Sequence, residues 1–136
     1  MIETQSNGAT EKIYLDADIT NQIIGCAIDV HKALGPGLLE SVYESCLVFE
    51  LTKAGLRVDR QKPLPVVYKG ITFDEGFRID VLVENKVVVE LKCVEKILPI
   101  HEAQIYTYLK LSGKKIGLLI NFNTKLLKDG LIRIAC

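Results

Sequence analysis

Residues 77–92, FRIDVLVENKVVVELK, constrain the fold more than any other part of the chain. Apolar residues alternate with other residues on both sides of a short polar stretch, and alternate residues of a strand face the same side of a sheet. The pattern predicts two antiparallel strands joined by a tight turn. The apolar faces are expected to consist of Phe77, Ile79, Val81 and Val83 on the first strand and Val87, Val89 and Leu91 on the second.

The length of the turn decides where the carboxylates of these strands lie. With three turn residues, 84–86, Val83 pairs with Val87 and Asp80 falls opposite Glu90. The Cβ atoms of the two carboxylates would then lie about 4.5–5.5 Å apart, with Lys92 two residues further along. A two-residue turn would instead place the two carboxylates on opposite faces of the sheet.

Two carboxylates at this separation repel each other unless a cation lies between them or one of them is protonated. Carboxylates, main-chain carbonyls and water are the ligands that Mg²⁺ or Mn²⁺ prefers, so a divalent ion would remove the conflict. The alternative is a cross-strand ion network on a solvated face, where charge pairs are common and weak. The charges alone leave both interpretations open.

Helical periodicity flanks this hairpin on both sides. It runs from Asp18 to residue 34, with Thr20 as a candidate N-cap, and a Gly-Pro-Gly sequence ends that helix. A second helix is predicted over 38–54, with Gly55 following its end, and a third over 100–111. The buried stripe of the second helix is expected to consist of Leu39, Val42, Cys46 and Phe49.

Three further strands complete the prediction. The first covers about 56–68, and its two prolines make it irregular or place it at a sheet edge. Residues 115–122 are nearly all apolar, as a strand buried on both faces requires, and a short strand over 131–135 follows. The order α-α-β-β-β-α-β-(β) predicts a mixed sheet flanked by helices, an α/β (α+β) fold.

The length of 136 residues leaves room for one domain, predicted over 18–136 behind a loose tail over 1–17. The four cysteines form no C-x-x-C pair, which excludes a structural zinc finger or a disulfide scaffold and indicates reduced thiols. No apolar stretch is long enough to span a bilayer, and the polar start does not resemble a signal peptide. We therefore expect a cytoplasmic protein with no membrane partner.

The net charge is zero, which argues against a protein that binds nucleic acid chiefly by bulk electrostatics. The charge is uneven, however, because residues 91–136 carry eight basic and three acidic residues. A phosphate-binding patch or a solvated face could use these side chains: Lys92, Lys96, Lys110, Lys114, Lys115, Lys125, Lys128 and Arg133.

Two predicted helices carry polar side chains at helical spacing. Glu40 and Tyr43 lie three residues apart on the second helix, away from its expected apolar stripe. On the third helix Gln104 and Tyr108 lie four residues apart, and His101 lies one turn before Gln104. Packing or solvent exposure would explain each alone, but together they place polar groups on both helices beside the carboxylates.

Four motifs then resemble one family. Asp80 and Glu90-Leu91-Lys92 resemble the D…(D/E)-x-K signature of the PD-(D/E)XK nuclease superfamily. The sequence from Gln104 to Tyr108 is similar to the Q-x-x-x-Y motif of its RecB-like branch, and Gly37-Leu-Leu-Glu40-Ser-Val-Tyr43 is similar to the signature of the small GxxExxY proteins. The resemblance runs from about residue 18 to the end. It departs from the pattern at Ile79, where the superfamily has its proline.

The resemblance implies a restriction-endonuclease-like core and a Mg²⁺ or Mn²⁺ cofactor bound by Asp80, Glu90 and the main-chain carbonyl of Leu91. Lys92 would orient or activate the attacking water. Glu40 would support the metal site, directly or through water, and Gln104 would position Lys92 or the phosphate. Tyr43, His101 and Tyr108 would support this set, although His101 also suits capping or packing at the start of its helix.

The leading interpretation is a metal-dependent nuclease, with DNA rather than RNA as the expected substrate. The alternative is a non-catalytic nucleic-acid-binding or accessory protein that retains the nuclease fold, which the neutral net charge makes credible. A homo-oligomer would enlarge a small binding surface, but no segment identifies an interface.

Overall fold

The computed structural model of the chain describes residues 16–136. It contains α2 (Ala17–Leu34), α3 (Glu40–Lys53), β1 (Val58–Tyr68), β2 (Ile71–Val83), β3 (Val87–Lys92), α4 (Pro99–Ser112), β4 (Ile116–Asn121), the short 3₁₀ helix η1 (Leu127–Gly130) and β5 (Leu131–Ala135). The predicted order of elements and the α+β class are confirmed, including the last strand. The predicted tail lies outside the described residues except for Asp16 and Ala17, and Ala17 already begins α2.

The five strands form one mixed sheet in the order β1-β2-β3-β4-β5. Only β3 and β4 are parallel, and α4 makes the crossover between them, because a parallel pair cannot be joined by a tight turn. β1 is an edge strand whose register shifts between Leu64 and Val66, where its prolines lie, as predicted. Every residue of β4 is buried, which confirms the prediction of a strand over 115–122 that is buried on both faces.

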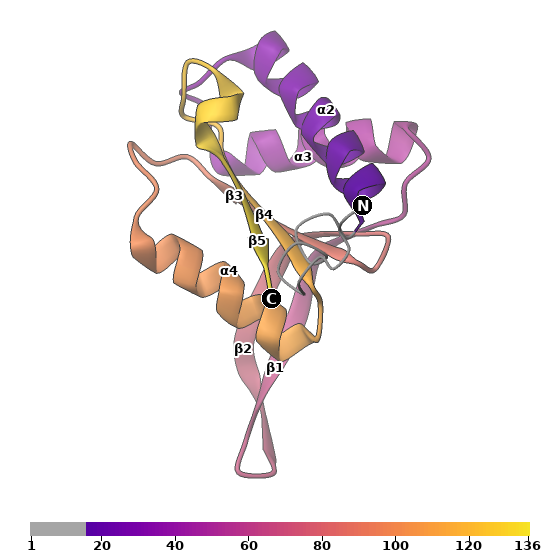
Figure 1. Cartoon of the computed structure of the whole chain (residues 1–136), viewed down its shortest axis with the longest axis vertical. Coiled ribbons are helices and arrows are strands. Elements are labelled where there is room, and N and C mark those ends of the chain that lie inside the picture. Colours follow the sequence, from indigo (N-terminus) through magenta and orange to yellow (C-terminus); the bar gives the residue numbers. More distant parts are fainter. Residues whose placement is uncertain (1–15) are drawn as a thin grey trace, which may run out of the picture.

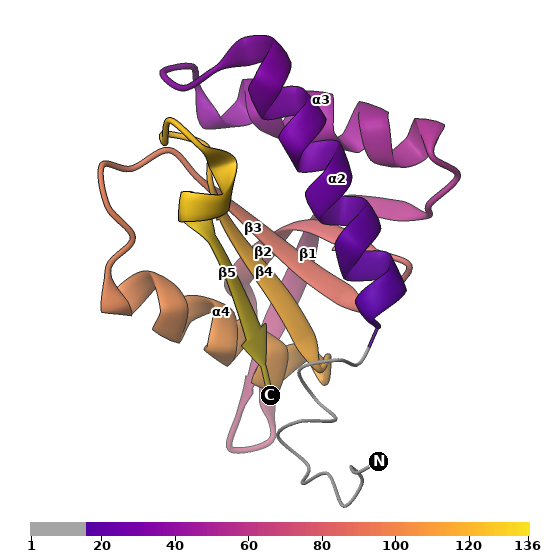
Figure 2. The same ribbon diagram turned by 45° about the horizontal axis from the view of Figure 1, so that its top comes forward.

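Helices cover both faces of the sheet (Figures 1 and 2). On one side α2 and α3 pack over a core that includes Val81, Val89 and Leu118. On the other side α4 packs over a smaller core that includes Leu82 and Leu119. Neighbouring residues of β2 and β4 therefore point into different cores, and this explains why β4 carries no polar alternation.

The β1–β2 hairpin extends beyond the rest of the sheet as a two-stranded ribbon (Figure 1). Its tip is the predicted Lys69-Gly70 turn, where both residues have left-handed backbones. β2 begins at Ile71, six residues before the predicted start. The prediction began too late because residues 74–76 (Asp-Glu-Gly) have the composition of a loop. Gly76 makes this pairing feasible, since a Cβ there would lie 2.1 Å from the carbonyl oxygen of Leu64.

Two local predictions for the helices were wrong. Thr20 is not an N-cap but lies in the first turn of α2, where its hydroxyl donates to the carbonyl of Ala17 at 3.0 Å. The stripe expected to be buried is exposed at Leu39 (73%), Val42 (38%) and Phe49 (63%), whereas Cys46 is partly buried against the core. The buried side chains of α3 are instead Tyr43, Glu44, Leu47 and Leu51.

The buried face of α3 follows from Tyr43. Its hydroxyl donates to the carbonyl of Gly35 and accepts from the backbone N–H of Leu38 at 3.1 Å, so the polar end of this buried ring is paired. The ring also stacks on Phe122, with centroids 4.5 Å apart. Tyr43 thereby fastens the turn between α2 and α3 to the core beneath it.

All four cysteines are free thiols. Among residues 16–136, no helix is long and apolar enough to cross a bilayer.

Candidate active site

The candidate site lies where β2 separates from β3. The two strands pair from Val83 with Val87 only as far as Val81 with Val89, which confirms the three-residue turn. Beyond that pair, the backbone N–H of Asp80 donates to Glu90 Oε2 at 3.0 Å, and the N–H of Leu91 donates to Asp80 Oδ2 at 3.0 Å. Two carboxylates thus replace backbone acceptors in the gap between the strands.

The alternation of β2 is interrupted at this gap, which corrects the predicted apolar face. Val81 and Val83 lie in the core under α2 and α3, whereas Phe77 and Ile79 lie in the core under α4. Asp80 is the residue between the two sets. The physical reason lies on β1. Gln61, which lies between the residues that pair with Val81 and Ile79, has a left-handed backbone that interrupts the regular pleat.

Burial and mutual repulsion raise the pKa values of the carboxylates. Burial and then the charge of Asp80 raise the pKa of Glu90 to about 8, against a hydrogen bond from the Asp80 backbone and the charge of Lys92. Burial also raises the pKa of Asp80, opposed first by the hydrogen bond from the Leu91 backbone. Burial and the charge of Asp80 raise the pKa of Glu40 as well. Lys92 lowers all three pKa values, so it is the neighbouring cation of the group.

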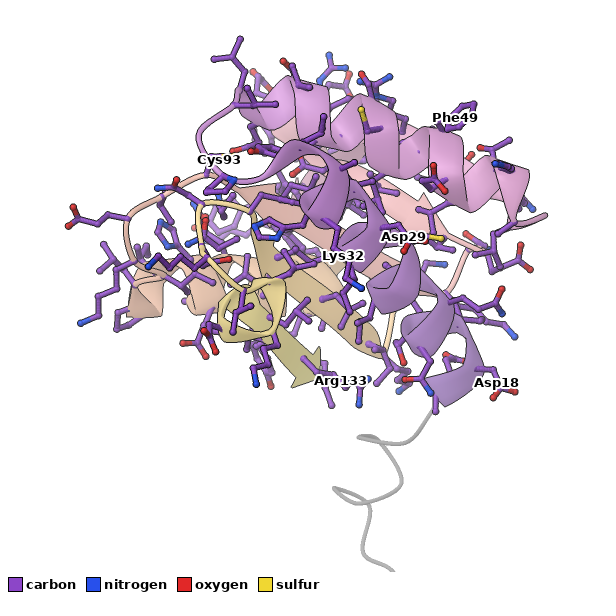
Figure 3. All side chains as sticks on the ribbon, turned by 90° about the horizontal axis from the view of Figure 1, so that it is seen from above. Asp18, Asp29, Lys32, Phe49, Cys93 and Arg133 are labelled. Carbon is purple, nitrogen blue, oxygen red and sulfur yellow. The ribbon has the colours of Figure 1, made fainter. Side chains whose placement is uncertain are left out.

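Glu40 reaches the strands because it is the first residue of α3. Its charge raises the pKa of Glu90 and of the Cys93 thiol, which directly follows β3. Figure 3 shows Cys93 beside α3 at the end of the strand. The N-terminal end of α3 and the C-terminal end of β3 therefore meet at the carboxylates.

A second network links these carboxylates to β1, and the sequence analysis missed it. Glu44, only 6% exposed, accepts from Arg60 Nε at 2.6 Å and from Gln61 Nε2 at 2.7 Å. The same Gln61 amide nitrogen lies 3.4 Å from Asp80 Oδ1, and Gln61 is the residue with the left-handed backbone, at φ 51°. Glu44 lies one turn after Glu40, so helical spacing could have indicated it.

Gln61 had no comparable signal in the sequence. Its place depends on the pairing of β1 with β2 and on a backbone conformation that few residues other than glycine adopt. It is the one residue of the described chain seen to bridge α3 and Asp80 by side-chain hydrogen bonds.

The three site residues predicted on α4, Tyr108, His101 and Gln104, lie in different surroundings. The Tyr108 ring stacks on Phe77 at 3.8 Å between centroids, and its pKa is raised by burial and then by the charges of Glu90 and Asp80. His101 caps its own helix, because its Nδ1 accepts from the backbone N–H of Leu98 at 2.9 Å. Gln104 is exposed on α4.

Tyr43 lies in the core and bonds to the α2–α3 turn, so it is separated from the carboxylates by its own packing. Of the eight predicted side chains, five each interact electrostatically with at least one other at the gap. They are Glu40, Asp80, Glu90, Lys92 and Tyr108.

The carbonyl of Leu91 also faces the gap. In a parallel strand pair, successive residues direct their backbone groups to alternate sides. The carbonyl of Lys92 accepts from the backbone N–H of Phe122 on the β4 side. The polar groups of Leu91 therefore point the other way, toward Asp80.

The oxygen atoms at this gap are of the kind that a hard divalent cation prefers as ligands. Carboxylate oxygens and a main-chain carbonyl converge on one gap, where burial first and like charges second raise the pKa values of Asp80 and Glu90. Within the part of the chain that the structure describes, no three His, Cys, Asp or Glu side chains are already arranged as a metal cage. Asp80 and Glu90 each direct one oxygen to a backbone amide, which leaves Glu90 Oε1 without a backbone partner.

A family model described as the PD-(D/E)XK nuclease superfamily matches residues 17–134. Comparison with curated proteins and comparison with solved structures each found no match.

Proposed function

Because the chain belongs to the PD-(D/E)XK nuclease superfamily, we propose that it is a nuclease that uses Mg²⁺ or Mn²⁺ to cleave nucleic acid, DNA rather than RNA. One observation carries the proposal: Asp80 and Glu90 share the gap between β2 and β3, and Lys92 is the cation beside them. The narrower likeness to the GxxExxY branch, and a cytoplasmic location, stay predictions from the sequence.

Asp80, Glu90 and the Leu91 carbonyl would hold the metal, and Glu40 would support it directly or through water. When bound, a divalent ion there would neutralise phosphoryl oxygens and lower the pKa of water. The raised pKa values of Glu90 and Asp80 support this assignment, because a bound cation would offset the burial and, secondarily, the like charges that raise them.

Lys92 would act on the phosphate and the attacking water. Its ammonium group lies within electrostatic reach of Asp80, Glu90 and Glu40, where it can donate a hydrogen bond to a phosphoryl oxygen as negative charge develops. Gln104 would contact the phosphate rather than Lys92, because its exposed side chain is available to a ligand. Tyr108 would form the wall of the site beside Glu90.

The experiment is a cleavage assay with end-labelled oligonucleotides of one sequence, as single- and double-stranded DNA and RNA. Each is incubated with the protein in Mg²⁺, in Mn²⁺ and in EDTA. We expect metal-dependent cleavage that is lost in Lys92→Ala and retained in Lys96→Ala, an exposed lysine in the loop that follows β3. Cleavage by Lys92→Ala at the wild-type rate would contradict the assignment.

The alternative, a non-catalytic nucleic-acid-binding or accessory protein, is favoured by the bonds that Asp80 and Glu90 make to backbone amides, since a structural role alone could retain them. This alternative expects no cleavage under any metal condition, with binding that is unchanged in Lys92→Ala.

A further inference from the structure

A cavity of about 420 Å³ lies between the C-terminal end of α2 and the loop that contains η1. Its lining includes Lys32 of α2 and both Lys125 and Lys128 of the loop, but no carboxylate. The remaining lining residues are Ile28, His31, Gly35, Pro36, Leu126 and Leu127. Figures 1 and 2 show η1 beside this end of α2.

The walls of this lysine cavity are joined by a buried hydrogen bond. His31, 7% exposed, places its Nε2 2.7 Å from the carbonyl oxygen of Thr124. A carbonyl only accepts, so Nε2 carries the hydrogen. The other wall is the α2–α3 turn, which Tyr43 fastens at Gly35. Both elements that carry the lysines are therefore fixed relative to each other.

None of the three lysines forms an ion pair within the described residues, since neither ion pair found there involves Lys32, Lys125 or Lys128. A basic residue in the last turn of a helix is expected, which explains Lys32. It does not explain two more lysines that a different element brings to the same hollow. Three like charges around one cavity favour an anion between them.

The cavity lies close to the carboxylate site. Gly35 precedes Glu40 by five residues, and an extended chain advances at most about 3.6 Å per residue, so their Cα atoms lie within roughly 18 Å of each other. On the other wall, Lys125 follows Asn121 by four residues, and Asn121 pairs with Lys92 in the sheet.

We propose that the lysine cavity binds a backbone phosphate of the nucleic-acid strand that is cleaved at Asp80 and Glu90, a proposal that rests on the proposed function. The bound phosphate would lie a few nucleotides along the strand from the scissile one, because only a few residues separate the chain segments that carry the two sites. The apolar floor formed by Ile28, Pro36 and Leu127 suits the sugar beside that phosphate.

The test compares the double variant Lys125→Ala/Lys128→Ala with the matched variant Lys53→Ala/Lys69→Ala, whose lysines are also exposed but lie elsewhere. Binding of single-stranded oligonucleotides of two to twelve nucleotides is measured by fluorescence anisotropy over a salt series. For a twelve-nucleotide strand we expect about tenfold weaker binding by the first variant, with a salt slope lower by about 0.7, because one phosphate contact of a single strand is lost. The matched variant should bind like wild type.

Cleavage separates this proposal from the proposed function. In the first variant KM for the long strand should rise while kcat stays unchanged, and cleavage of a dinucleotide should not change. Unaltered binding of the long strand would overturn the proposal while wild-type cleavage upholds the nuclease. An equal loss with the dinucleotide would also overturn it. Weaker binding by the variant, with no cleavage by wild type, would uphold the cavity and overturn the nuclease.

Discussion

Asp80 and Glu90 accept hydrogen bonds that backbone carbonyls accept in a regular sheet. A buried N–H that loses its acceptor costs about 1–3 kcal/mol. Residues that would hold a metal therefore also complete the pairing of β2 with β3. For this reason Asp80→Asn, which keeps a carbonyl oxygen near Leu91, is a better inactive variant than Asp80→Ala.

Lys92 is expected to affect the rate more than metal binding. Lys92→Ala should reduce cleavage about 10²–10³-fold, as when one preorganised donor is removed from a developing charge. Its Mn²⁺ affinity should stay the same or improve, because a neighbouring positive charge is lost. Lys92→Arg should restore little activity, since a planar fork replaces a compact ammonium group. Single-turnover rates and Mn²⁺ titrations measure the two effects separately.

Gln61 is expected to hold Asp80 in position. Gln61→Ala and Gln61→Gly both remove the amide that lies between Glu44 and Asp80, and each should weaken Mn²⁺ binding about 10–100-fold. Only the alanine should also be strained at φ 51°, by about 1 kcal/mol. A glycine variant that melts at or above the wild-type temperature yet binds Mn²⁺ poorly would assign the loss to the side chain. Normal Mn²⁺ affinity in both variants would contradict this role.

At the scale of elements, the turn between α2 and α3 depends on a single buried hydroxyl. The Tyr43 hydroxyl bonds to Gly35 and Leu38, immediately before α3 presents Glu40. The same turn forms one wall of the lysine cavity. A change at Tyr43 should thus act on both through the backbone.

Tyr43→Phe should lower the free energy of unfolding by about 0.5–1.5 kcal/mol, because it removes two partly buried hydrogen bonds, one to the carbonyl of Gly35 and one from the backbone N–H of Leu38. Urea denaturation measures this loss. Tyr106→Phe is the matched control, since Tyr106 is exposed on α4 and should change stability by less than about 0.5 kcal/mol. Equal effects of the two substitutions would show that the Tyr43 hydroxyl does not stabilise the turn.

The turn between β2 and β3 was predictable because Val83 and Val87 must both be buried, and the three-residue turn pairs these two residues. The orientation of α3 was not predictable from hydrophobicity, since Leu39 and Phe49 are as apolar as the buried Leu47 and Leu51. The outcome depended on partners distant in sequence, namely Gly35 for the hydroxyl and Phe122 for the ring. Gln61 depended on a left-handed backbone that no local pattern indicates.

At the scale of the whole molecule, the buried carboxylates make stability depend on pH. The pKa of Glu90 is raised from 4.5 to about 8, so the native state holds a proton that the unfolded state releases between these values. The unfolded state then binds fewer protons, and stability falls as pH rises. The contribution is complete below pH 4.5 and is lost as pH rises through about 8.

The metal-free protein should therefore lose stability from pH 5 to 8 relative to Glu90→Gln, by at most about 1.4 kcal/mol per pH unit. Glutamine resembles the protonated acid and should remove this dependence. Mg²⁺ should raise the wild-type melting temperature more at pH 8 than at pH 5, because it binds the deprotonated carboxylates. Parallel melting curves for wild type and Glu90→Gln across this range would contradict a raised Glu90 pKa.

The ribbon formed by β1 and β2 ends at Lys69 and Gly70, beyond β3, β4 and β5 and the helices that pack on the sheet. Two strands that pair only with each other add little to the stability of a domain, and exposed turns tolerate added sequence best. A peptide tag or a fluorescent domain inserted between Lys69 and Gly70 would thus leave the core and the carboxylates in place. This turn is therefore a suitable site for labelling or tethering the protein without modifying either terminus.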